Sequence, residues 1–282
     1  MAMESVTAAR VREEPRVLED YANLGTFREL WDYRELFYFL AWRDVKVRYK
    51  QTLLGILWAV IQPLFTMVIF TVVFGQIANL SSDGVPRPIF YFSALLPWIY
   101  FSSTLSSAGM SLVSNSSLLT KIYFPRIILP AAAILVPLID FFIGSVLLAG
   151  FIVYYDIPIG WNLLLWPLLV VPLAMLSFGV GSLLAALNVT YRDIKYAIPF
   201  GIQILLFMTP IIYPSSVFPE KFRWLLALNP LSGLIEAFRY AVVPTYSIHW
   251  DVLGLSLAVT TALLVLGVVY FKRIEKAFAD IV

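Results

Sequence analysis

The stretch FRELWDYRELFYFLAWRDVKVRYKQTLLGILWAVIQPLFTMVIFTVVFG (residues 27–75) joins two kinds of helix. In residues 27–50, large apolar side chains lie between Arg, Glu and Asp, a pattern typical of a helix lying flat on a membrane surface. Residues 51–75 are apolar and long enough to cross a bilayer. No short basic stub followed by an apolar run, the mark of a secretory signal, comes before them. We therefore expect a mature multi-pass membrane protein with an amphipathic interface helix at 27–52 and a cytosolic N-terminus.

The composition points to a membrane protein. Of the 282 residues, 60% are hydrophobic and 13% are charged, whereas soluble domains have roughly a quarter charged residues. There is no Cys, which excludes disulfides, thiolate metal sites and cysteine nucleophiles. The net charge of +2 gives no reason to expect a nucleic-acid partner. We expect one transmembrane domain at 53–282 and a disordered cytosolic segment at 1–26.

The predicted fold class is an all-α polytopic membrane protein with six transmembrane helices. The six apolar segments can each cross about 30 Å of hydrocarbon, and they lie at 53–78, 89–113, 127–155, 161–187, 196–213 and 251–271. The fifth is the shortest and has Pro199 and Pro210 near its ends, so we expect it to bend or to leave the membrane early. Pro63 and Pro137 predict kinks in the first and third segments.

The basic residues predict the orientation of these segments. With the N-terminus inside, 16 of the 20 Lys and Arg residues fall in cytosolic flanks and four in outer loops. The excess of basic residues marks the cytosolic side. Both termini are therefore predicted to be cytosolic.

The outer segment before the last span contains two helix-start signals. Pro219 can occupy the first turn of FPEKFRWLLAL, and Asn229 followed by Pro230 fits an N-cap with proline at the first helical position. Each helix is too short to span the bilayer. We expect a helical hairpin at 214–242 on the outer face, with an ordinary packed loop as the alternative.

The loop SNSSLLTKIYFPR (114–126) predicts a short cytosolic helix at 116–125. Asn115 or Ser116 can cap about two turns, and Pro125 limits the end. The spacing gives one exposed apolar face, made of Leu118, Leu119, Ile122 and Tyr123. Such a face indicates a docking partner; the alternative is that it rests on the membrane.

Few residues offer chemistry. Asp140 is an acidic residue inside a span, and Arg126 is 14 residues from it, about 20 Å along a helix. We therefore expect Asp140 to have no basic partner and either to face a packed interior or to line a conduit. The single His249 is interpreted as structural, and without a second His no metal site is expected. The sequence has no P-loop, so no nucleotide site of that kind is expected on this chain.

Two further patterns have two interpretations each. A serine-rich face on the second span is either a close helix contact or a hydrophilic strip along a translocation path; it contains Ser102, Ser103, Ser106, Ser107 and Ser111. Aromatic rings within spans suit the faces of sugars, but lipid-facing or core packing explains each of them as well; they are Phe65, Phe70, Phe74, Phe200 and Phe207.

From about residue 30 onwards, the chain resembles the membrane permease subunits of polysaccharide ABC exporters of the O-antigen and teichoic-acid type. Five fragments carry the resemblance: RDVKVRYKQTLLGILWAVIQPL (43–64), LLTKIYFPRIILP (118–130), LNVTYRDIKYAIP (187–199), MTPIIYP (208–214) and LNPLSGLIEAFRY (228–240). The resemblance implies a type-2 ABC exporter permease in the bacterial inner membrane that exports an undecaprenyl-linked polysaccharide. It implies a transport subunit and no enzyme, with ATP and Mg²⁺ on a separate ATPase chain.

The resemblance also implies four groups of site residues. The group expected to contact the ATPase is Leu118, Leu119, Lys121, Ile122, Tyr123, Arg126, Tyr191, Arg192 and Asp193. The entrance group, which would meet either the lipid pyrophosphate or anionic headgroups, is Arg28, Arg34, Arg43, Lys46 and Arg48. The channel aromatics are Phe65, Phe70, Phe74, Phe200, Phe207 and Tyr213. The periplasmic gate is Trp224, Asn229, Pro230, Glu236 and Arg239.

The implied partners are a second copy in a C2 homodimer, two ATP-binding cassette subunits, the lipid-linked polysaccharide and membrane lipids. Two alternatives stay open at this point. One is a related permease that exports a small lipophilic molecule. The other is a membrane glycan-modifying enzyme, which the scarcity of facing ionisable groups argues against.

Overall fold

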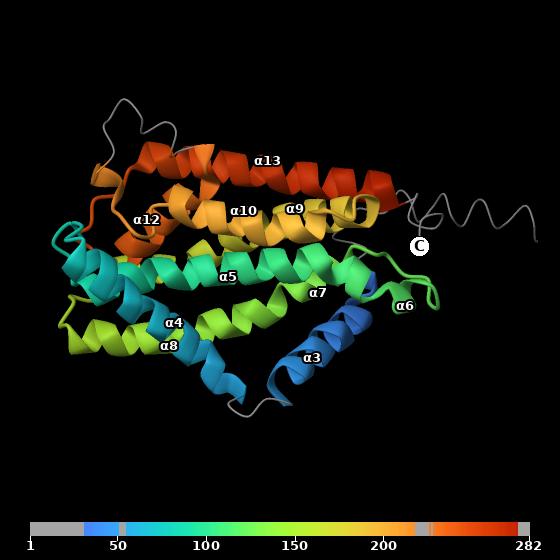
Figure 1. Cartoon of the computed structure of the whole chain (residues 1–282), viewed down its shortest axis with the longest axis horizontal. Coiled ribbons are helices and arrows are strands. Elements are labelled where there is room, and N and C mark those ends of the chain that lie inside the picture. Colours follow the sequence, from blue (N-terminus) through green and yellow to red (C-terminus); the bar gives the residue numbers. More distant parts are fainter. Residues whose placement is uncertain (1–30, 51–54, 218–225, 227, 276–282) are drawn as a thin grey trace, which may run out of the picture.

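A computed structural model describes residues 31–50, 55–217, 226 and 228–275, and every regular element within those residues is helical (Figure 1). The predicted segment 1–26, Arg28, and most of the first helix of the hairpin, Trp224 included, lie outside the described residues. The α-helices are α3 (Arg34–Lys50), α4 (Trp58–Phe70), α5 (Arg87–Ser114), α6 (Ser116–Leu119), α7 (Ile128–Ala133), α8 (Leu135–Tyr154), α9 (Leu165–Thr190), α10 (Ile194–Met208), α12 (Pro230–Val242) and α13 (Trp250–Glu275).

Five helical stretches in the described part are long and apolar enough to cross a membrane. They are Gly55–Ile77, Arg87–Ser114, Ile128–Tyr154, Trp161–Thr190 and Trp250–Glu275, and they coincide with five of the six predicted spans. The remaining predicted span, 196–213, overlaps α10, whose 15 residues extend only about 22 Å along a helix axis. The prediction of an early end therefore describes this segment better than a full crossing does.

Prolines account for two of the helix boundaries. The third span is divided at Ile134, between α7 and α8. Pro137 lacks the N–H that would bond to Ala133, and its ring crowds that carbonyl, so the predicted break falls one turn before the proline. At the end of α10, Thr209 is extended because Pro210 follows it.

The core is built around α5. In Figure 1 this helix runs through the middle of the bundle, with α9, α10 and α13 on one side and α8 on the other. Within the apolar windows, 78% of α5 is buried, compared with 17% of Gly55–Ile77. The first span therefore has most of its surface left for lipid or for another subunit.

The helices α9 and α13 approach each other through glycine. A Cβ on Gly267 would lie 2.0 Å from the carbonyl oxygen of Gly179, and a Cβ on Gly179 would lie 2.5 Å from Cα of Leu264. Only residues without side chains permit this backbone contact, which is typical of close packing between membrane helices. It fixes α13 against the centre of the bundle.

The interface helix α3 lies on the flank of the bundle. It packs against α7 and α8, and Leu40 and Ala41 are buried. Other apolar side chains of α3 remain exposed, including Tyr38, Phe39 and Trp42. The structure confirms a helix here, with apolar side chains pointing both into the bundle and outwards. In Figure 1, α3 and α4 form a V whose apex points away from the rest of the molecule.

Candidate functional site

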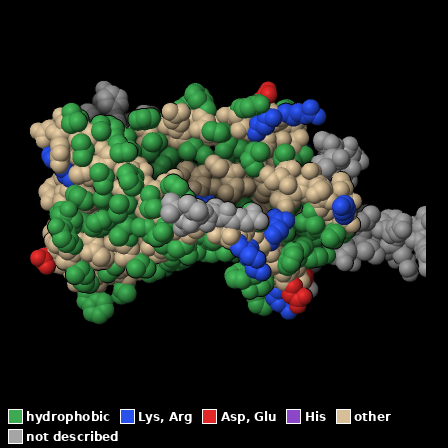
Figure 2. Space-filling model, turned by 60° about the horizontal axis from the view of Figure 1, so that its bottom comes forward, with side chains coloured by type: hydrophobic (Ala, Val, Ile, Leu, Met, Phe, Trp, Pro, Cys, Tyr) green, Lys and Arg blue, Asp and Glu red, His purple; other side chains and the backbone are tan. Residues whose placement is uncertain are grey.

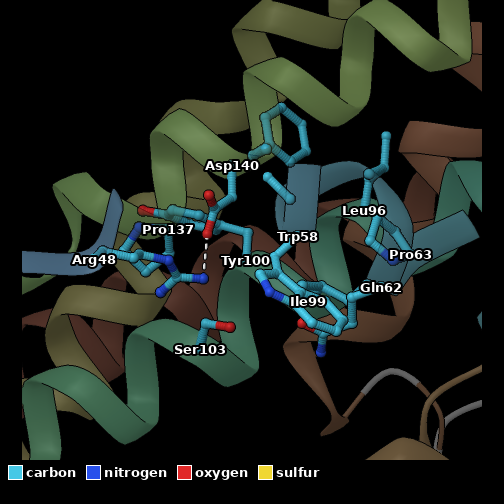
Figure 3. Close-up of a pocket in the computed structure, with 12 residues that line it drawn as sticks. Arg48, Trp58, Gln62, Pro63, Leu96, Ile99, Tyr100, Ser103, Pro137 and Asp140 are labelled. Atoms are coloured by element: carbon cyan, nitrogen blue, oxygen red, sulfur yellow. Dashed lines mark ion pairs between the residues drawn. The ribbon is translucent and has the colours of Figure 1, made fainter. Parts of the chain in front are cut away.

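The prediction that Asp140 has no basic partner is wrong. Arg48, near the end of α3, forms an ion pair with Asp140 on α8, and the Tyr49 hydroxyl donates a hydrogen bond to the same carboxylate. Figure 3 shows the guanidinium and the carboxylate pointing toward each other between the helices. Burial first, and then the hydrogen bond to Asp140, raise the pKa of the Tyr49 phenol, so this hydroxyl stays protonated and donates. The cluster ties the interface helix to the third span.

Asp140 and Arg48 line a small pocket of about 20 Å³. Side chains from α4, α5 and α8 close it, among them Trp58, Gln62 and Ser103 (Figure 3). The space is comparable to a single water molecule and does not accommodate a larger ligand.

A much larger cleft of about 500 Å³ opens beside this pocket, between α3 on one side and α5 and α7 on the other. Its lining combines charged, polar and apolar residues: Leu40, Arg43, Asp44, Val47, Arg48, Ser107, Ser111, Ser114, Asn115, Leu129, Ala132, Ala133 and Val136. Figure 2 shows a hollow in this face of the molecule, with uncharged polar side chains and backbone on its floor and Lys and Arg side chains beside it. Cavities of roughly 300–1,000 Å³ are typical of small-ligand sites.

The serine-rich face of α5 contributes to this cleft through Ser107 and Ser111, while Ser103 lines the small pocket. The hydroxyls of Ser107 and Ser111 donate to the carbonyls of Ser103 and Ala108, at 2.8 and 2.7 Å. Both interpretations of this face therefore stay open, with Ser107 and Ser111 beside the cleft.

The other entrance residues of α3 have local partners. Both Nε and Nη2 of Arg43 donate to Oδ1 of Asp44, at 2.9 and 2.8 Å. The ammonium group of Lys46 lies 5.4 Å from the centre of the Trp42 ring. Arg34 donates to the carbonyl of Trp31 and stacks over its ring. The structure thus brings Arg43 and Arg48 together at the cleft and places Arg34 at the far end of α3.

The short helix expected at 116–125 is shorter than predicted. It ends at Leu119, after one turn. The side chain of Asn115 donates to the carbonyl of Ser111 and does not cap the helix. The residue before Pro125 is also disfavoured in helical conformation. The predicted common face therefore divides: Leu118 and Leu119 pack against a buried cluster, whereas the last two members of that face, Ile122 and Tyr123, are 55% and 69% exposed.

Two further predicted coupling elements flank this segment. Arg126 contacts the end of α13: its backbone N–H donates to Oε1 of Glu275 at 2.6 Å, and its guanidinium to the carbonyl of the same residue at 3.3 Å. Between α9 and α10, the side chains of Tyr191, Arg192 and Asp193 are exposed, as is Lys121. Nothing in the sequence signalled the link from Arg126 to Glu275.

The predicted start of the second hairpin helix is confirmed. Pro230 is the first residue of α12, and the Asn229 side chain accepts a hydrogen bond from the N–H of Leu231 at 3.1 Å. The amide of Asn229 also donates to Thr209, just after α10, at 2.9 Å. One side chain thus caps α12 and joins it to the fifth apolar segment.

The two charged gate residues of α12 are buried. Arg239 is 1% exposed; it donates to the carbonyls of Phe90 and Ile211, at 3.3 and 2.8 Å, and its guanidinium lies 3.7 Å from the centre of the Phe90 ring. Glu236 is 2% exposed, with Oε2 at 3.6 Å from Nδ1 of His249. Burial raises the pKa of Glu236, with Ser215, His249 and Arg239 acting in the opposite direction. These residues are part of the packed bundle and do not form an open gate surface.

The predicted channel aromatics do not share one surface. Phe65, Phe200 and Phe207 are exposed on α4 and α10. Phe70 and Phe74 are half-buried and pack edge to face with each other, and the Tyr213 hydroxyl donates to the carbonyl of Phe207 at 2.9 Å. Within the described residues, no group of three His, Cys, Asp or Glu side chains is placed to hold a metal ion.

These features define a multi-pass α-helical membrane protein with a cleft beside α3. Residues 35–243 match the ABC-2 type transporter family, and the chain belongs to this family. It is therefore a permease-type transport protein.

The chain is also similar to curated proteins over most of its length. It is 27% identical to an O-antigen export system permease protein, RfbA, of Klebsiella pneumoniae, over 85% of this chain and 92% of that protein. It is 32% identical to a protein of the same name in Myxococcus xanthus, over 75% of this chain and 82% of that one. It is 26% identical to the polysialic acid transport protein KpsM of Escherichia coli, over 83% and 92%.

Proposed function

We propose that this chain is the membrane-spanning subunit of an ATP-driven exporter that moves an undecaprenyl-diphosphate-linked O-antigen, or a similar cell-surface polysaccharide, across the bacterial inner membrane. The observation that carries the proposal is its similarity to permeases named for O-antigen export, over 85% of this chain and 92% of the relative. The similarity to a polysialic acid transport protein extends the same substrate class to an acidic glycan.

In this proposal the working complex contains two copies of the chain and two ATPase subunits, which bind ATP and Mg²⁺. The exposed apolar faces of α4 and α10 support a second copy, because they leave apolar surface that another subunit can cover. Both termini are cytosolic, as the distribution of basic residues predicts.

The cleft between α3 and α5 then borders the cytosolic entrance, where the charged end of the lipid-linked glycan arrives. The exposed side chains of Ile122 and Tyr123 dock on the ATPase, because an apolar pair exposed on a cytosolic loop favours a protein contact. The hairpin at 214–242 closes the outer end of the path.

The test uses the purified complex with its ATPase, reconstituted in nanodiscs with lipid-linked glycan. We expect the glycan to stimulate ATP hydrolysis. The double substitution Ile122→Ala with Tyr123→Ala should abolish both stimulation and co-purification of the ATPase.

The matched control carries the same two changes at the opposite end, at Tyr154 and Ile159, which are 77% and 71% exposed. This control should keep the wild-type activity. An ATPase rate that lipid-linked glycan leaves unchanged in the wild-type complex would contradict the proposed function.

A further inference from the structure

Arg48 lies at the boundary between two cavities. It lines the small pocket that contains Asp140, and it also lines the 500 Å³ cleft that contains Arg43. In the structure its guanidinium points to Asp140 (Figure 3). The side chain is 42% exposed, whereas that of Asp140 is 11% exposed. A rotation of one side chain would therefore turn the guanidinium from the carboxylate toward the cleft.

The chemistry of the cleft favours an anion with several oxygens. A guanidinium binds phosphate through two parallel hydrogen bonds, and it is less strongly hydrated than an ammonium. Arg43 lines the same cleft and is held by Asp44. Both arginines that face the cleft are thus neutralised by carboxylates of the chain itself.

Asp140 would keep a partner if Arg48 left. The Tyr49 hydroxyl donates to the carboxylate independently of the ion pair. A buried carboxylate without any donor is strongly disfavoured, but one hydrogen-bonded to a phenol is less so. The arrangement therefore permits an exchange of partners at Arg48.

We propose that Arg48 is a switch residue: Asp140 holds its guanidinium while the cleft is empty, and the phosphate end of the lipid-linked substrate replaces Asp140 when it enters, releasing α3 from α8. This inference rests on the proposed function and deepens it, because it assigns the recognition of a lipid phosphate or diphosphate to this cleft. Asp140 acts through Arg48 as a competing internal anion and is a positioning residue.

The proposal makes opposite predictions for the two partners. Asp140→Asn removes the competitor, so the affinity for lipid diphosphate should rise by about twofold to fivefold, the range of a partly exposed ion pair. Arg48→Gln removes a charged donor, so the affinity should fall by about tenfold. An ion pair with only a structural role would weaken binding in both variants.

The experiment measures the binding of radiolabelled undecaprenyl diphosphate to the complete complex in nanodiscs. Glu35→Gln is the matched control, because it removes one exposed acidic charge from the first turn of α3, away from the cleft, and should leave affinity unchanged. If Arg48→Gln does not fold, Arg48→Lys provides a milder variant, which should bind more weakly than wild type because it lacks the planar fork.

Competitors distinguish the sources of the phosphate. Displacement by inorganic diphosphate indicates recognition of the headgroup and supports the proposal. Displacement by phosphatidylglycerol alone indicates general anchoring to anionic lipid and overturns it. Hydrogen exchange of residues 43–50 gives a second readout: Asp140→Asn should accelerate it without ligand, and lipid diphosphate should do so in wild type.

A fall in affinity for Asp140→Asn overturns the switch, even where wild type binds and transports normally. In contrast, a wild-type complex that exports or hydrolyses ATP independently of lipid-linked glycan indicates that the proposed function itself fails. The two failures are therefore distinguishable.

Discussion

The two arginines at Arg48 and Arg239 lie in regions of opposite character. Arg239 is enclosed by α5, α12 and the segment after α10, and its side chain donates to two backbone carbonyls. Arg48 lies on the flank of the bundle, with a side chain 42% exposed and one carboxylate partner. The comparison separates a fixed frame, made of α5, α9, α12 and α13, from a flank, made of α3 and α4, whose contacts can be exchanged.

The largest effect is expected at Arg239, in the frame. Arg239→Leu removes the donor that contacts the carbonyls of Phe90 and Ile211, and it removes the guanidinium near the buried carboxyl of Glu236. We expect a loss of about 3–5 kcal/mol in stability, the range for breaking a buried charge network. Thermal unfolding of the detergent-solubilised protein, followed by size-exclusion chromatography, measures it.

The matched experiment in the flank is the same measurement on Asp140→Asn. We expect this variant to lose less than about 1 kcal/mol of stability, because Arg48 is partly exposed and the Tyr49 hydroxyl can still donate to residue 140. Equal losses of stability in Arg239→Leu and Asp140→Asn would show that the charged contacts of the frame and of the flank contribute equally to stability. Arg239→Lys should restore little, since a single ammonium cannot reproduce the two hydrogen bonds in this geometry.

A second test concerns the contact that holds the frame together. Gly267→Ala places a methyl group against the carbonyl oxygen of Gly179, where a Cβ would be 2.0 Å away. The two helices must separate, so we expect a loss of about 1–3 kcal/mol, as for other overpacked sites. Gly254→Ala, on the same helix, is the control, because nothing lies within 4 Å of its added Cβ. If both alanine variants melt at the wild-type temperature, α13 is not held by this contact.

Local features of the helices could be predicted from the sequence, because they depend on neighbouring residues. The apolar runs predicted five spans that the structure contains. Asn229 followed by Pro230 predicted the start of α12. Pro137 gave the break between α7 and α8. Each of these signals acts within about one helical turn, so tertiary packing does not overrule it.

The flank could not be predicted in the same way. Arg48 and Asp140 are far apart in the chain, and no periodicity indicates which span a surface helix lies against. The resemblance implied that Glu236 and Arg239 belong to a periplasmic gate, and nothing in the sequence indicated that both are buried. Burial is possible there because the guanidinium donates to the backbone carbonyls of Phe90 and Ile211 and stacks on the Phe90 ring.

The smallest expected effect is a pH dependence within the frame, at Glu236. Burial raises the pKa of this carboxyl, so the folded protein binds the proton more tightly than the unfolded chain. Its contribution to stability is therefore fully present below the usual glutamate pKa and is lost as the pH rises through the raised value. The charged and titratable groups around it are Arg239, His249 and Tyr246, and protonation of His249 favours the ionised carboxylate and so opposes the effect.

Glu236→Gln should remove this contribution and flatten the dependence of the unfolding temperature on pH, measured from about pH 5 to about pH 8. Asp251→Asn is the control, because this carboxylate is exposed at the start of α13 and its removal should leave the wild-type slope. If the glutamine variant keeps the wild-type slope, Glu236 is ionised throughout this range and its charge is stabilised by Arg239 and His249. In that case the frame would contain a permanent ion cluster at its outer end. The contrast between the frame and the Arg48–Asp140 pair in the flank would then depend on Arg239 alone.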